Sequence, residues 1–134
     1  MIDKLNGSRY YFYDANGNRR TSSGWKKVNG STAYYVCDGG YVTSRYTDQK
    51  GTKKVYDFDY SKNTWVQKKN MWKTVYRSRY YFGSKGVATM SYNNSTKKAY
   101  KFTGRKWKPA KKLIMKIGNA NYYFNSAAKR VVKA

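Results

Sequence analysis

The stretch SRYYFYDANGNRR, residues 8–20, sets adjacent aromatic residues before a turn signal and two arginines. Aromatic residues favour strands, and Asn-Gly between such runs is typical of a tight β-hairpin turn. Similar phrases return as SRYYFGSKG at 78–86 and NYYFNSAAKR at 121–130. The sequence therefore predicts a β-hairpin that recurs along the chain.

The spacing of the aromatic pairs defines this repeat. The second aromatic residues of the six pairs are Tyr11, Tyr35, Phe58, Tyr81, Phe102 and Tyr123. Successive members of this series are 24, 23, 23, 21 and 21 residues apart. Tryptophan comes early in one kind of unit, at Trp25 and Trp72. It comes late in the alternating kind, at Trp65 and Trp107. We expect one domain over residues 1–134 with about six hairpin units, at 4–21, 24–44, 45–67, 70–90, 91–109 and 110–134.

Single hairpins of about 20 residues are marginally stable, so neighbouring units must bury one another's aromatic faces. Tyr56, Phe58 and Tyr60 alternate with aspartates, which is the period of a half-buried strand. No stretch has a sustained helical period, although residues 126–134 fit a short helix as well as a strand. We predict an all-β fold of tandem hairpins stacked as an elongated β-solenoid-like array. Two small SH3-like barrels built from the same strands are the alternative.

Composition points to an anionic partner. The chain has 29 Lys and Arg against 6 acidic residues, a formal net charge of +23, and it has no His. A positive electrostatic field of this size predicts an anionic partner: a nucleic acid, an anionic membrane surface or an acidic polymer such as a phosphate-rich wall glycan. Sixteen tyrosines among 40% hydrophobic residues predict a thin, aromatic core.

Several chemistries lack the residues that they need. General acid–base catalysis usually uses His, Glu or paired carboxylates, and the only close acidic pair is Asp57 with Asp59. Cys37 is the single cysteine, which excludes an internal disulfide and argues against a metal site. We therefore expect no enzyme activity, no cofactor and no metal.

Targeting signals are absent from the sequence as well. No apolar run approaches the roughly 20 residues of a membrane span. The start, MIDKLNGSRYY, lacks the apolar segment of a signal peptide. If the protein acts outside the cell, we expect this chain to be a fragment of a parent that carries the signal.

The stretch GWKKVNGSTAYYVCDGGYVTS, residues 24–44, resembles the cell-wall-binding repeat of Gram-positive surface proteins, with its Gly-Trp, Asn-Gly and Tyr-Tyr elements. Residues 6–24, NGSRYYFYDANGNRRTSSG, are similar to the related glucan-binding repeat. The resemblance implies a non-catalytic module of tandem hairpins that holds a secreted protein on the cell envelope. Basic surface-anchoring domains of lactic-acid bacteria, including those associated with surface layers, look similar in charge.

Choline-binding members of this family hold choline in an aromatic cage that needs a second Trp before the Tyr pair. The corresponding positions here are Arg9, Ala33, Arg79 and Asn121. We therefore expect the phosphates of teichoic or lipoteichoic acid, or another anionic wall polysaccharide, rather than choline. Nucleic-acid binding is the alternative, since basic patches between aromatic residues suit single strands. An adhesin domain for acidic host glycans is a third class.

Basic side chains that recur with the repeat are the candidate polyanion contacts, because many weak phosphate contacts add through effective concentration. They are Arg19, Arg20, Lys26, Lys27, Lys68, Lys69, Lys73, Arg77, Arg79, Lys97, Lys98, Lys101, Arg105, Lys106, Lys108, Lys111 and Lys112. The candidate aromatic platforms are Trp25, Tyr35, Tyr41, Trp65, Trp72, Tyr81, Trp107 and Tyr123.

Overall fold

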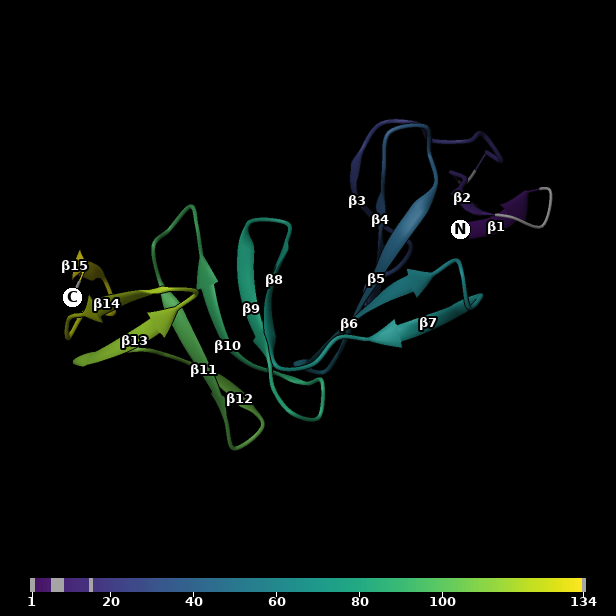
Figure 1. The fold of residues 1–134 in the computed structure, drawn as a ribbon. Coiled ribbons are helices and arrows are strands. Elements are labelled where there is room, and N and C mark those ends of the chain that lie inside the picture. Colours follow the sequence, from purple (N-terminus) through teal and green to yellow (C-terminus); the bar gives the residue numbers. More distant parts are fainter. Residues whose placement is uncertain (1, 6–8, 15, 134) are drawn as a thin grey trace. The chain divides into compact units, whose positions relative to one another are not determined.

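The computed structural model describes residues 2–5, 9–14 and 16–133, and all regular elements in these ranges are β-strands (Figure 1). The chain folds into two compact units, which we call unit 1 (Met1–Lys68) and unit 2 (Lys69–Ala134). All strand pairings are antiparallel.

Unit 1 holds a two-stranded sheet and a five-stranded meander, in which each strand pairs with the next along the chain. The two-stranded sheet consists of β1 (Ile2–Leu5) and β2 (Arg9–Phe12). The meander consists of β3 (Gly24–Lys27), β4 (Thr32–Val36), β5 (Val42–Gln49), β6 (Thr52–Asp59) and β7 (Thr64–Gln67).

Unit 2 repeats the five-stranded meander and adds a three-stranded sheet after it. Its meander consists of β8 (Met71–Val75), β9 (Ser78–Phe82), β10 (Ala88–Asn93), β11 (Ala99–Thr103) and β12 (Lys106–Pro109). The three-stranded sheet consists of β13 (Leu113–Ile117), β14 (Ala120–Phe124) and β15 (Arg130–Lys133). The prediction of an all-β fold of tandem antiparallel hairpins is confirmed, and the sheets are open rather than closed into barrels.

The early tryptophans of the sequence repeat occupy equivalent places in the two meanders. Trp25 of β3 lies opposite Tyr35, and Trp72 of β8 lies opposite Tyr81. Both pairs bring their ring centroids to 5.4 Å. Aromatic pairs in this range add about 0.5–1.5 kcal/mol beyond the area that they bury.

The late tryptophans also occupy equivalent places, because each lies on the last strand of its meander. Trp65 lies opposite Phe58, and Trp107 lies opposite Phe102. Their ring centroids are 5.0 and 5.1 Å apart. The early tryptophan of the sequence repeat therefore belongs to the first strand pair of a meander. The late tryptophan belongs to its last strand pair.

A small core in each unit joins the meander to the additional strands. In unit 1 the buried residues Phe12, Val36 and Val42 meet the partly buried Tyr10, Tyr34 and Trp65. In unit 2 the buried residues are Tyr92, Ala99, Ala110, Met115, Ile117 and Phe124, with Trp72, Met90, Leu113 and Tyr122 packed against them. Full burial of a side chain such as Phe124 contributes about 1.5–3 kcal/mol, so these clusters fix where the additional strands lie.

The turn that follows β2 forms as the sequence predicts. One carboxylate oxygen of Asp14 accepts hydrogen bonds from the backbone N–H groups of Asn16 and Asn18, both at 2.9 Å. Gly17 adopts a φ of 80°, which glycine tolerates without strain. Tyr13 then pairs with Arg19 in an isolated bridge. Ala15 of this turn, and the Asn-Gly at residues 6–7, lie outside the described residues.

Two local expectations are resolved by the strands. Pro109, which the repeat pattern places in a link between units, ends β12 opposite Tyr100 instead. Because β12 is the outer strand of its sheet, the missing N–H removes no bond from the ladder. Of the two readings of residues 126–134, the strand is present as β15. The division into six hairpin units stays a prediction, and two of its boundaries fall within β5 and β10.

Gly40 joins the turn between β4 and β5 to β2 by a backbone hydrogen bond. Its carbonyl accepts the N–H of Phe12 at 3.2 Å, and its own N–H donates to the carbonyl of Cys37 at 2.9 Å. Gly40 has a φ of +91°, and a Cβ there would lie 2.7 Å from the carbonyl oxygen of Arg20. Glycine at this position therefore allows the backbone after the Asp14 turn to approach the meander.

We expect Gly40→Ala to lower the free energy of unfolding of unit 1 by about 3 kcal/mol, because it combines left-handed strain with a backbone clash. Gly39→Ala is the matched control, since Gly39 has a φ of +94° but open space around its Cβ position. The control variant should lose only about 1 kcal/mol. Urea denaturation measures both, and equal losses would contradict the role of the close contact.

Candidate anion-binding surfaces

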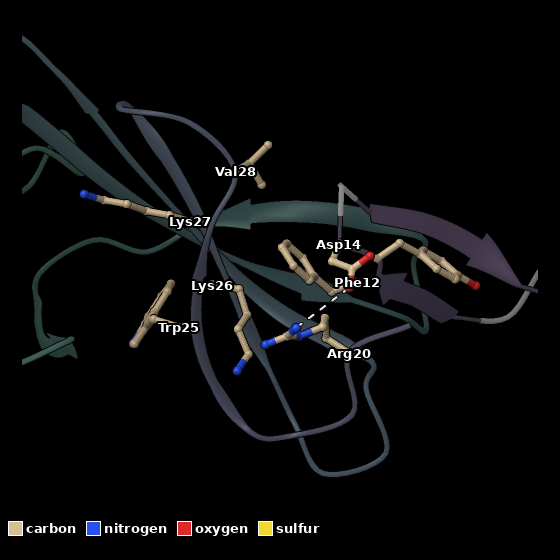
Figure 2. A pocket seen from close by; sticks show the side chains of 8 residues that line it. Phe12, Asp14, Arg20, Trp25, Lys26, Lys27 and Val28 are labelled. Atoms are coloured by element: carbon tan, nitrogen blue, oxygen red, sulfur yellow. Dashed lines mark ion pairs between the residues drawn. The ribbon is translucent and has the colours of Figure 1, made fainter. Parts of the chain in front are cut away.

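An open hollow of about 670 Å³ lies beside β3 in unit 1 (Figure 2). Its lining residues are Phe12, Tyr13, Asp14, Arg20, Trp25, Lys26, Lys27 and Val28. Four of the residues that the sequence predicts as contacts therefore meet in one place: Arg20, Trp25, Lys26 and Lys27. They come from two segments, the chain after the Asp14 turn and the edge strand β3.

Charge and apolar surface are combined in this hollow. Figure 2 shows Lys26 and Lys27 directed to different sides of β3, while Arg20 points toward Asp14. The guanidinium of Arg20 lies 3.8 Å from the Asp14 carboxylate, and its side chain is 52% exposed. Exposed ion pairs of this kind contribute about 0–1 kcal/mol, so an incoming anion can compete for Arg20. The amine of Lys26 donates to the Ser22 hydroxyl at 3.0 Å and stays next to the hollow.

The two adjacent arginines of the opening stretch have separate surroundings. Arg20 lines the hollow, whereas the guanidinium of Arg19 lies 4.7 Å from the ring centroid of Tyr11. Tyr11 in turn forms an isolated bridge with Tyr41, one of the predicted platforms. Both arginines are exposed, and a cation above an aromatic ring is stabilised by the quadrupole of the ring.

In unit 2 the densest group of predicted cations lies on the β11–β12 hairpin. Lys101 lies directly opposite Lys108, and Thr103 lies opposite Lys106. The turn between them contains Arg105, whose φ is 66°. All four basic side chains are exposed. Like charges directly opposite on a sheet destabilise it, so this hairpin carries a cost that a bound anion would relieve.

The remaining predicted cations are spread over strands β8 and β9 and over the turns and links of the chain. Lys68 lies 3.8 Å from Asp57 in an ion pair. The guanidinium of Arg79 lies 5.8 Å from the ring centroid of Trp72 and within van der Waals reach of Gly118. The others are Lys69 and Lys73 at β8, Arg77 in the β8–β9 turn, Lys97 and Lys98 between β10 and β11, and Lys111 and Lys112 before β13. As polyanion contacts they stay predictions.

The predicted aromatic platforms are largely engaged by their own neighbours. Trp65 contacts Tyr10 at 6.4 Å and Tyr34 at 6.0 Å between ring centroids, in addition to Phe58. Tyr123 of β14 lies between Ile114 and Val132 of the adjacent strands. Within the residues lining the large hollow, Trp25 is the one predicted platform. A ligand-binding role for the other rings stays a prediction.

Sequence reasoning passed over a second hollow, of about 150 Å³, on the β5–β6 hairpin. It is lined by Arg45, Thr47, Gln49, Thr52, Lys54 and Tyr56. The signal for it is visible in the sequence, since these residues alternate at every second position on either side of Lys50-Gly51.

Asp57 and Asp59 serve local structure. The Asp57 carboxylate accepts the Ser44 hydroxyl at 2.7 Å and pairs with Lys68. A hydrogen bond from the Ser61 hydroxyl, joined by the backbone N–H of Lys62, lowers the pKa of Asp59 below its ordinary value. A carboxyl with a lowered pKa is a poor proton donor near neutral pH.

Among residues 2–5, 9–14 and 16–133, no group of three or more His, Cys, Asp or Glu side chains could hold a metal ion. The same described ranges contain no helix that is long and apolar enough to span a membrane.

No protein-family model and no curated protein matches this sequence. Similar solved structures include alternansucrase in complex with isomaltononaose, with 16% identity and a TM-score of 0.36 over 96% of this chain and 8% of that one. Choline binding protein F from Streptococcus pneumoniae has 20% identity and a TM-score of 0.30 over 97% of this chain and 41% of that one. The choline-binding domain of CbpL from Streptococcus pneumoniae has 20% identity and a TM-score of 0.25, with 97% and 76% covered.

These overlays do not carry a functional argument, since each TM-score is at most 0.36. The chain spans less than half of the alternansucrase and of choline binding protein F.

We expect Lys101→Glu to raise the free energy of unfolding by about 0.5–1 kcal/mol, because it turns the Lys101–Lys108 repulsion into attraction. Lys111→Glu changes the net charge equally but lies outside the strands, so it controls for general charge reduction. The double variant Lys101→Glu with Lys108→Glu restores a like-charge pair and should lose the gain. Chemical denaturation at low salt measures all three, and equal stabilisation by Lys111→Glu would contradict a pairwise effect.

Proposed function

We propose that this chain is a non-catalytic module that binds an anionic polymer of the Gram-positive cell wall, teichoic or lipoteichoic acid. In this role it attaches a secreted protein to the cell surface. The observation that carries the proposal is the excess of cations: 29 basic residues face 6 acidic ones, which leaves 23 positive charges without a carboxylate. Most of the predicted contact residues are exposed, and they occur in both units.

The distribution of these cations suits a long polymer better than a single small ligand. The hollow beside β3 and the β11–β12 hairpin are separate groups, each with at least three basic side chains. Individual exposed contacts are worth little, but contacts to repeated phosphates along one chain add through effective concentration. A polymer with a phosphate in every repeat supplies such contacts.

The hollow beside β3 also fits the non-ionic part of such a polymer. Phe12 and Trp25 contribute apolar surface to its lining, and Arg20, Lys26 and Lys27 contribute positive charge. Glycerol, ribitol and sugar units have C–H faces that pack on aromatic rings and hydroxyls that remain solvated. This combination supports a glycan or polyol phosphate as the ligand class.

The non-catalytic assignment has support from the acidic residues. Asp57 is occupied by Ser44 and Lys68, and Asp59 holds the turn at Ser61 and Lys62. The carboxylate that lines the hollow beside β3 is Asp14, which accepts the N–H groups of Asn16 and Asn18 and lies 3.8 Å from the Arg20 guanidinium.

The test is binding to purified walls and to walls stripped of teichoic acid, over a salt series. Binding should require the polymer and fall steeply with salt, because exposed charges are screened over about 10 Å at 0.1 M. The triple variant Arg20→Gln, Lys26→Gln, Lys27→Gln should weaken binding by about tenfold, at roughly 0.5 kcal/mol for each exposed contact. Lys101→Gln, Lys106→Gln, Lys108→Gln should have a similar effect.

A control triple, Lys62→Gln, Lys85→Gln, Lys129→Gln, removes the same charge from exposed turn positions outside these groups. It should weaken binding by less than threefold. Equal binding to intact and stripped walls would exclude the polymer as the ligand. Tight, length-dependent binding to single-stranded DNA that outcompetes the wall polymer would favour a nucleic-acid ligand instead.

A further inference from the structure

The β5–β6 hairpin presents a compact polar face that lies apart from the cations discussed above. Three cross-strand pairs form it: Arg45 opposite Tyr56, Thr47 opposite Lys54, and Gln49 opposite Thr52. Side chains at every second position share one face of a sheet, and these six line the smaller hollow of about 150 Å³. Two cations, three hydroxyls and an amide are therefore gathered along two strands.

The guanidinium of Arg45 is held in place before any ligand arrives. It lies 4.5 Å from the ring centroid of Tyr56 and 4.7 Å from that of Trp65, so two rings fix its plane. Its Nε is buried and has no hydrogen-bond partner among the described residues. A buried donor without a partner typically costs about 1–3 kcal/mol, so the two ring contacts hold Arg45 in this position against that cost.

No carboxylate of these strands shares this face. Asp48 and Asp57 alternate with the hollow-lining residues and belong to the opposite face. Asp48 pairs with Lys53 at 2.6 Å, and Asp57 accepts the Ser44 hydroxyl at 2.7 Å. The positive charges of Arg45 and Lys54 are therefore not neutralised from within the hairpin.

We propose that this face is a subsite for one phosphate group and its attached polyol. Arg45 and Lys54 bind the phosphate oxygens, since Arg can donate to two oxygens and Lys acts as a point charge. Thr47, Gln49 and Thr52 bind the polyol hydroxyls. The inference rests on the proposed function, because the same wall polymer would supply the polyol phosphate.

The aromatic rings of this site argue against two other ligands. A cationic group such as a quaternary amine needs a free ring face, but Arg45 already covers Tyr56 and Trp65. Nucleobases bind single-strand sites by stacking on aromatic rings, and the same guanidinium occupies that place. Hydroxyl and phosphate groups bind without stacking on a ring, so the polar side chains of the β5–β6 face can hold them.

The experiment is a titration of the isotope-labelled full chain with glycerol 3-phosphate, followed by NMR at the backbone amides. We expect saturable shifts at residues 45–56. Lys54→Gln and Arg45→Lys should each weaken binding at least fivefold. Lys62→Gln is the matched control, since it removes the same charge from the β6–β7 turn and should change affinity by less than a factor of two.

A second arm separates the polyol from the phosphate. Thr47→Val should weaken glycerol 3-phosphate binding about threefold while leaving inorganic phosphate unchanged. If Lys62→Gln weakens binding as much as Lys54→Gln does, or if no shifts saturate at residues 45–56, the subsite is overturned. If a short deoxyoligonucleotide displaces glycerol 3-phosphate from these amides at lower phosphate concentration, the polyol assignment is overturned.

These outcomes are distinct from a failure of the proposed function. The titration uses no wall material, so saturable binding at residues 45–56 stands even if intact and stripped walls bind equally. Conversely, polymer-dependent wall binding without these shifts would keep the proposed function and reject this subsite. Thermal unfolding of each variant shows that the fold is intact, and Lys54→Gln and Thr47→Val keep the test decisive if Arg45→Lys is unstable.

Discussion

An open β-meander cannot bury its own faces, and this constraint determines how the rest of the molecule is built. Each unit meets it with extra strands. In unit 1, Phe12 of β2 covers Val36 and Val42. In unit 2, Phe124 of β14 packs with Tyr92 and Ala99. The largest fully buried side chains are Phe82 and Phe124 with the aliphatic Ile117, Val36, Val42, Val55 and Val75, so the cores combine a few aromatic and aliphatic residues.

Covering the meanders in this way leaves charge at the edges and turns. β3 and β12 are edge strands, and they carry Lys26, Lys27, Lys106 and Lys108 of the two candidate surfaces. Lysine on an edge strand also discourages pairing with another sheet. The same residues therefore protect an open sheet and are the cations on which the proposed polymer binding rests. The Lys101–Lys108 pair shows the cost, since the strand register places like charges opposite each other.

Arg45 shows how the aromatic framework positions a cation as well as filling the core. Trp65 belongs to the core of unit 1 and also supports the guanidinium of Arg45. A cation fixed in this way loses little side-chain freedom when an anion binds, so more of the interaction energy appears as affinity. A framework of stacked rings can thus place positive charge accurately on a protein that has few acidic residues to position it.

The sequence by itself determined the hairpin class, the two alternating tryptophan positions and the Asp14 turn, because these depend on strand period and turn chemistry within a few residues. It also determined the net charge of +23, on which the proposal of an anionic partner rests, since charge is a property of composition. Only the tertiary structure decided which cations share a surface. Arg20 meets β3 through the close approach at Gly40, and Arg45 meets Trp65 through the register of three strands. Contacts between residues far apart in the chain depend on strand pairing and backbone fit, which no local pattern specifies.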